Sequence, residues 1–133
     1  MHVKRVDHIG IAVADLAGAI EAYETLGLRA SSVENVPSED VRVALFPVGD
    51  TRIELLEPSR EDSVIDRYLK KHGEGVHHIA LEVRNIDKAS RELVEAGVRL
   101  VYESPHPGEG GSRINFVHPA STRGVLIELR EGS

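Results

Sequence analysis

The sequence predicts an α+β fold in which two βαβββ modules pair into one open, cup-shaped mixed sheet. The first observation is an internal repeat: at a shift of seventy positions, residues 7–16 (DHIGIAVADL) lie on residues 77–86 (HHIALEVRNI) without a gap. Two copies at so long a period indicate a duplicated module rather than a solenoid. The second observation is that each copy has too few strands to bury both faces alone. The copies must therefore pack on each other or on a partner chain.

The first module, residues 1–58, is expected to follow the order strand, helix, strand, strand, strand. Residues 6–13 are rich in β-branched residues, which favours a mostly buried strand. A helix follows, with Asp15 as its N-cap and Gly27 as the residue that ends it. Three further strands are expected at residues 28–36, 41–48 and 52–57.

The second module, residues 76–133, repeats this plan after a polar connecting segment, residues 59–75, that carries a helical stretch. Its helix is expected to begin after Asn85 and to end at Gly97. Its strands are expected at residues 76–83, 98–102, 114–118 and 125–129, with a loop rich in glycine and proline at 104–112. Together the two modules make residues 1–133 a single domain.

Composition and charge indicate the class of protein and exclude some kinds of partner. The hydrophobic content of 41% and the charged content of 29% are typical of a globular protein, and no apolar run approaches the roughly 20 residues of a membrane helix. The N-terminus lacks a signal-peptide pattern, and zero cysteines exclude disulfides and thiolate metal sites, so we expect a cytoplasmic protein. A net charge of −6 argues against nucleic acid as a partner.

Each module offers one histidine on its first strand and one glutamate on its last strand. His8 falls on His78 at the shift of seventy, and Glu54 falls on Glu128 at a shift of seventy-four, because the loop at 104–112 is longer. Alternation puts each glutamate on the face opposite its apolar neighbours. If the modules pair, two neutral imidazoles and two carboxylates converge and balance the charge of a divalent cation. Nitrogen and oxygen ligands suit Zn, Co, Ni, Mn or Fe(II).

Histidine and glutamate also have ordinary roles in strands that need no metal. A single histidine in a strand is more often a hydrogen-bonded core residue than a ligand, and a lone glutamate there is usually solvated. The recurrence of all four residues at equivalent positions of a repeat favours the metal site. The remaining histidines lack such equivalents; we expect His118 to bond the turn at Pro119, and we expect no ligand among His2, His72, His77 and His106.

Paired modules with this ligand set resemble the vicinal oxygen chelate superfamily, whose fold is glyoxalase/bleomycin-resistance-like. Within it, the chain is similar to the methylmalonyl-CoA epimerase family. The resemblance is carried by DHIGIAV, GDTRIELLEP, GEGVHHIALEV and FVHPASTRGVLIEL, which together reach over nearly the whole chain. It implies one divalent ion held by His8, Glu54, His78 and Glu128. The metal that the resemblance implies first is Co²⁺, and Zn²⁺, Ni²⁺ and Mn²⁺ are the alternatives. It also implies a homodimer.

The resemblance implies an isomerase that interconverts the C2 epimers of methylmalonyl-CoA by α-proton abstraction through a metal-stabilised enolate. Such a reaction needs an acid/base group on each face of the planar intermediate. The family assigns one role to the glutamate that matches Glu128, and the other to a glutamate directly after a Val-Pro pair. Ser38 stands at that second position here, so we predict that Glu39 acts instead. Adjacent strand residues point to opposite faces, so this requires residues 37–40 to be irregular or to carry a bulge.

Three alternatives stay open at this point. A glyoxalase I-type lactoylglutathione lyase uses a similar set of histidines and glutamates. A non-catalytic, bleomycin-resistance-like binding module shares the fold without the ligands, and the fourfold coincidence argues against it. An extradiol dioxygenase uses three protein ligands where four are present here.

Overall fold

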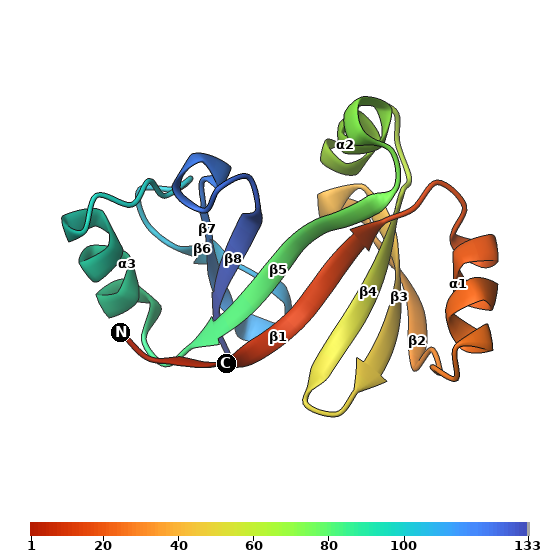
Figure 1. The fold of residues 1–133 in the computed structure, drawn as a ribbon, viewed down its shortest axis with the longest axis horizontal. Coiled ribbons are helices and arrows are strands. Elements are labelled where there is room, and N and C mark those ends of the chain that lie inside the picture. Colours follow the sequence, from red (N-terminus) through yellow and green to blue (C-terminus); the bar gives the residue numbers. More distant parts are fainter. Residues whose placement is uncertain (133) are drawn as a thin grey trace. The chain divides into compact units, whose positions relative to one another are not determined.

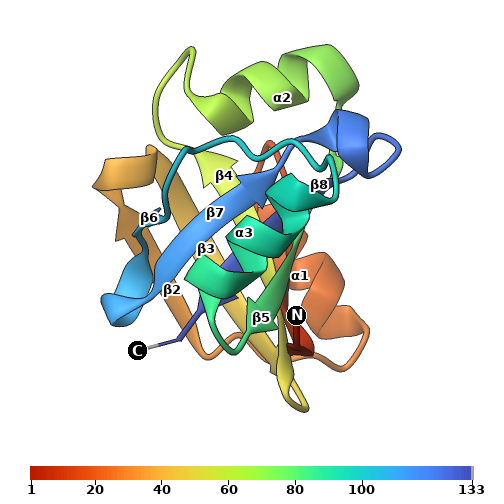
Figure 2. The same cartoon turned by 90° about the vertical axis from the view of Figure 1, so that its left-hand side faces the viewer.

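Residues 1–132 are described by a computed structural model, in which eight strands form one mixed sheet and three α-helices pack on it (Figures 1 and 2). The strand order is β2-β3-β4-β1-β5-β8-β7-β6, so the sheet stays open, with β2 and β6 at its edges. The strands are β1 (Val3–Ala12), β2 (Ser32–Val36), β3 (Val41–Val48), β4 (Thr51–Pro58), β5 (Gly75–Val83), β6 (His106–Pro107), β7 (Arg113–Val117) and β8 (Leu126–Glu131). The helices are α1 (Leu16–Thr25), α2 (Val64–His72) and α3 (Ile86–Glu95).

The two predicted βαβββ modules are confirmed by this order of elements. In the first module β1 pairs in parallel with β4, and β3 then pairs antiparallel with both β4 and β2. The second module repeats the pattern, with β5 parallel to β8 and β7 antiparallel to both β8 and β6. A glycine with positive φ ends the helix of each module, Gly27 at 96° and Gly97 at 86°. Both glycines were predicted to do so.

The chain divides into two compact units, and the division passes through β1 and β5. One unit consists of residues 1–7 with the chain from His78 onward, and the other of residues 8–77. The first half of β1 therefore belongs to the unit of the second module. Within that unit the backbone N–H of Arg84 donates to the carbonyl of His2, and Arg5 and Arg130 both bond the carboxylate of the buried Asp7.

The cores explain why successive leucines of β4 are both buried. Leu55 packs with Phe46 and with Leu16 of α1, whereas Leu56 packs with Ile65 of α2. Adjacent strand residues point to opposite faces, so α1 and α2 contact opposite faces of this part of the sheet. In the other unit α3 lies over its own strands (Figure 2), through a cluster formed by Val83, Ile86, Ala89, Val117 and Leu129.

Two predicted strands differ from the structure. Residues 28–36 form a strand only from Ser32, because Leu28 and Ala30 pack against the α1 cluster instead. Residues 98–102 form no strand beyond a single bridge at Leu100.

The side chain of Asn115 explains the second difference. Its Oδ1 accepts the N–H of Tyr102 and its Nδ2 donates to the carbonyl of Tyr102, each at 3.1 Å. A buried amide thus satisfies backbone groups that a strand ladder would otherwise pair. The edge of β7 is taken by the two-residue β6, which lies inside the predicted loop at 104–112.

Within residues 1–132, none of the helices is long and apolar enough to cross a membrane.

Candidate metal centre

His8 and Glu54 lie together because of the parallel register of β1 and β4. Gly10 is the Cα partner of Glu54, and His8, two residues earlier, shares the face of Gly10. His8 Nδ1 lies 3.6 Å from Glu54 Oε2, and the exposed fractions of the two side chains are 8% and 12%. Arg52 Nη2 donates to the same Oε2 at 3.2 Å. The first module thus delivers the predicted histidine–glutamate pair, with an arginine attached.

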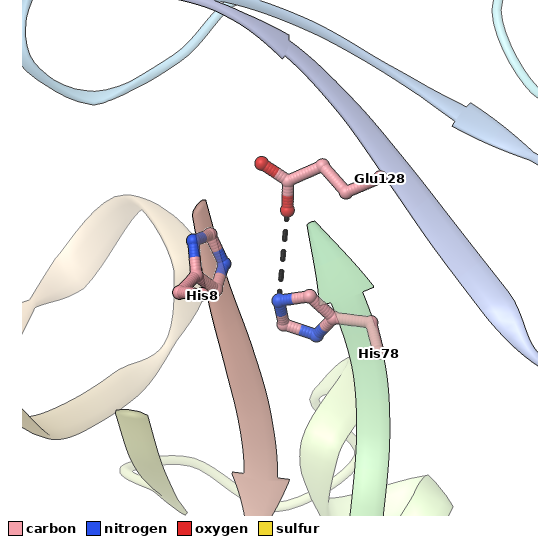
Figure 3. Close-up of side chains that lie close together, drawn as sticks. All are labelled: His8, His78 and Glu128. Atoms are coloured by element: carbon pink, nitrogen blue, oxygen red, sulfur yellow. Dashed lines mark ion pairs between the residues drawn. The ribbon is translucent and has the colours of Figure 1, made fainter. Parts of the chain in front are cut away.

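The second module repeats this geometry. Ala80 is the Cα partner of Glu128 in the parallel pairing of β5 and β8, and His78 precedes Ala80 by two residues. His78 Nε2 lies 3.6 Å from Glu128 Oε1, drawn as the dashed line in Figure 3. Both residues are only 8% exposed.

Small residues stand opposite both glutamates. Gly10 has no side chain, and the methyl group of Ala80 is fully buried. In each module the small residue therefore leaves room above the sheet for the imidazole and the carboxylate to approach each other. The separation of 3.6 Å is too long for a hydrogen bond. It is close to the roughly 3 to 3.5 Å that separates two ligands each bound at about 2.1 Å to one ion.

Three of the described residues form a group that can hold a metal ion, namely His8, His78 and Glu128. Each offers one ligand atom, these atoms lie within 4.8 Å of one another, and all three residues are buried (Figure 3). Imidazole nitrogens and a carboxylate oxygen suit a divalent cation. Glu54, the fourth predicted ligand, stays outside this group and is bonded by Arg52.

Three of the other histidines have a backbone or ring partner for their side chains. His118 Nδ1 accepts the N–H of Ala120 at 3.0 Å, which confirms its predicted role in the turn at Pro119. His106 stacks on Tyr102 with ring centroids 3.7 Å apart. His77 meets the ring of Tyr68 edge-on, and burial lowers the pKa of His77, with a smaller contribution from His72.

The segment that carries Glu39 is irregular, as predicted. Pro37–Glu39 form a single 3₁₀ turn, and Asp40 follows in the left-handed region with φ of 55°. Ser38 and Glu39 are exposed. The carboxylate of Asp40 is bonded by Arg60 at 2.9 Å. Glu39 is therefore released from the strict alternation of a strand, and its role as a base stays a prediction.

No role was predicted for Glu57 and Glu131, although these two glutamates repeat at the same shift as Glu54 and Glu128. Glu57 Oε2 accepts the N–H of Leu16 at 2.7 Å, and Glu131 Oε1 accepts the N–H of Ile86 at 2.9 Å. Each last strand thus carries a second carboxylate that holds the first turn of its own helix. The seventy-four-residue shift, extended by three positions, was the signal for them.

The fold agrees with a comparison against known families. The sequence model of the Glyoxalase/Bleomycin resistance protein/Dioxygenase superfamily matches residues 7–116, so this class of protein includes the chain.

Relatives of known name narrow the class. The chain is 37% identical over 132 residues to the ethylmalonyl-CoA/methylmalonyl-CoA epimerase of Cereibacter sphaeroides, covering 97% of this chain and 98% of the relative. The crystal structure of methylmalonyl-CoA epimerase from Mycobacterium tuberculosis superposes with a TM-score of 0.89 at 44% identity, covering 98% and 89% of the two chains. A methylmalonyl-CoA epimerase in complex with methylmalonyl-CoA and NH₄⁺ gives 0.87 at 40%, covering 99% and 96%. The chain belongs to the methylmalonyl-CoA epimerase family.

Proposed function

We propose that this chain is a metal-dependent epimerase that interconverts the two C2 epimers of methylmalonyl-CoA. The observation that carries the proposal is the histidine–glutamate pair, with side chains at most 12% exposed, that recurs at equivalent positions of both modules. The named relatives and the solved complex with methylmalonyl-CoA support the choice of substrate, because both chains are covered almost completely at 37% to 40% identity.

His8, His78, Glu128 and Glu54 would hold one divalent ion. The first three already offer ligand atoms as a group, and Glu54 lies 3.6 Å from His8. Co²⁺ is our first choice, and the same nitrogen and oxygen donors accept Zn²⁺, Ni²⁺ or Mn²⁺. Bound there, the ion would supply Lewis-acid polarisation of the thioester carbonyl, which acidifies the α-proton.

The residues of this chain would then move the proton. Glu128 takes the proton from C2 on one face, so that the C–H electron pair delocalises into the thioester. Glu39, in its protonated form, returns a proton to C2 on the opposite face and inverts the configuration. In the reverse direction the two carboxyl groups exchange roles, and one proton is taken up for each released.

The test is incubation of the cobalt-loaded protein with one epimer of methylmalonyl-CoA in deuterated water. We expect one deuterium at C2, detected by mass, together with appearance of the other epimer. Protein stripped with a chelator is the control and should show neither. Absence of both exchange and epimer formation in the loaded protein would sink the proposal. Rapid thioester formation from methylglyoxal and glutathione would favour the glyoxalase-type lyase instead.

The homodimer and the cytoplasmic location expected from the sequence remain predictions. Sedimentation of the purified chain tests the first, and fractionation of cells tests the second.

A further inference from the structure

The two halves of the candidate centre differ in charge at one pair of equivalent positions. Arg52 is the Cα partner of His8, and in the second module Leu126 is the Cα partner of His78. Arg52 and Leu126 are therefore equivalent, and each stands two residues before its glutamate on the same face of the sheet. The duplicated site carries a guanidinium in one half and an apolar side chain in the other.

The guanidinium lies on the carboxylate of Glu54. Arg52 Nη2 is 3.2 Å from Glu54 Oε2, the oxygen that also lies 3.6 Å from His8 Nδ1. The Arg52 side chain is 31% exposed and that of Glu54 is 12% exposed. The pair is formally neutral, so Glu54 with its arginine offers a metal ion an oxygen ligand without net negative charge.

This pairing changes the charge of the complete centre. Two neutral histidines, Glu128 and Glu54 would cancel a divalent cation entirely. With Arg52 counted, one positive charge remains. A net positive centre attracts an anionic ligand with two oxygens more strongly than a neutral one does.

We propose that Arg52 is a positioning residue that keeps the metal-loaded centre net positive, so that it accepts a chelating carboxylate of the malonate type. The inference rests on the proposed metal site and names the charge of the ligand that this site prefers. A unit charge near a partly exposed site changes a binding constant by about tenfold. Arg52→Leu, which copies the second module, should therefore weaken the binding of such an anion about tenfold.

The experiment measures malonate binding to cobalt-loaded protein by calorimetry and by the visible absorption of Co²⁺. Cobalt affinity is measured separately by competition with a chelator. We expect Arg52→Leu to retain cobalt and to bind malonate about tenfold more weakly. Arg52→Lys keeps the charge and should stay within about threefold of the unmodified protein. The double variant Arg52→Leu/Glu54→Gln restores the original net charge, so its malonate affinity should return toward the unmodified value.

Each other result overturns the inference. Unchanged malonate affinity in Arg52→Leu would show that the charge is immaterial. Loss of cobalt together with malonate would show that Arg52 only holds Glu54 in place. Failure of the double variant to recover would point to a specific contact rather than to net charge. If the expected pattern is found but deuterium exchange at C2 fails, the epimerase proposal falls and this inference stands. If the unmodified protein binds no cobalt, both fall.

Discussion

The carboxylate of Glu57 accepts the backbone N–H of Leu16 at 2.7 Å and thereby holds the first turn of α1 on the sheet. Asp15 occupies the N-cap position of the same helix, yet its side chain makes no capping hydrogen bond. Glu57, on strand β4, thus provides the hydrogen-bond acceptor that the side chain of Asp15 does not provide. A carboxylate at this end of a helix satisfies a free donor and interacts favourably with the helix dipole.

Replacing Glu57 by alanine should lower the free energy of unfolding by about 1 kcal/mol, because that acceptor and its charge are lost. The equivalent change at Glu131 removes the acceptor of Ile86 and should cost a similar amount. Urea denaturation measures both. Glu21→Ala, an exposed change on α1, is the control and should leave stability unchanged or slightly raised. A loss no larger than that of the control would refute the capping role.

Replacement of either His8 or His78 by alanine should release most of the bound divalent metal and leave the fold intact. Each variant removes one proposed nitrogen ligand and keeps the strand that carries it. Elemental analysis of protein purified without chelator gives the metal content per chain. His72→Ala serves as the control, because His72 packs against Tyr68 and should not affect the metal. Full occupancy in both the His8 and His78 variants would disprove the site.

Stability should depend on pH through His77, whose pKa is lowered by burial and then by His72. The folded protein binds fewer protons at this residue than the unfolded chain, whose histidine titrates near pH 6.5. Stability from this residue is therefore complete above that value and is lost as pH falls below it. His77→Gln should remove this part of the pH dependence between about pH 7.5 and 5.5.

The measurement for His77 is urea denaturation of metal-free protein across the pH range, with each variant compared with the unmodified chain. Above about pH 8 the imidazole of His77 is neutral, as the glutamine side chain always is. The difference in the free energy of unfolding between the two proteins should therefore be constant there. A difference that is equally constant down to pH 5.5 would rule out a contribution from His77.

Glu39→Gln should abolish epimerisation while some deuterium exchange at C2 continues through Glu128. The amide cannot return a proton to the second face, whereas abstraction on the first face is untouched. Asp40→Asn is the matched control, since Asp40 is engaged by Arg60 and should not serve as the base. If Glu39→Gln epimerises at the unmodified rate, Glu39 is not the base, and Ser38 becomes a reason to doubt the substrate.

The repeat predicted most of the fold because it fixes both elements and register. His8 and His78 could be placed on strands from their apolar neighbours, and the glutamates from the matching segments of the last strands. The same pattern wrongly predicted a strand at residues 98–102. What decides there is the side chain of Asn115, which bonds Tyr102 from another strand. A long-range bond of this kind leaves no periodic signal in the sequence.

The role proposed for Arg52 was not predicted from the sequence. An arginine two residues before Glu54 lies on the same face of a strand, but an exposed arginine there is unremarkable in a sequence. The shift of seventy-four places Arg52 on Leu126, but only the register shows that Arg52 is the Cα partner of His8. Comparing the two halves at matched register, rather than matched identity, would have found it.

The three-residue spacing between Glu54 and Glu57 has a consequence for how the chain folds. An odd spacing sends one carboxylate to each face of the sheet, one beside His8 and the other to the start of α1. If β4 slipped by one residue, the first carboxylate would turn into the apolar packing of α1 and the second would leave its helix. Glu128 and Glu131 impose the same condition on β8. The spacing therefore favours the native register, because a sheet with β4 in the wrong register is destabilised on both of its faces.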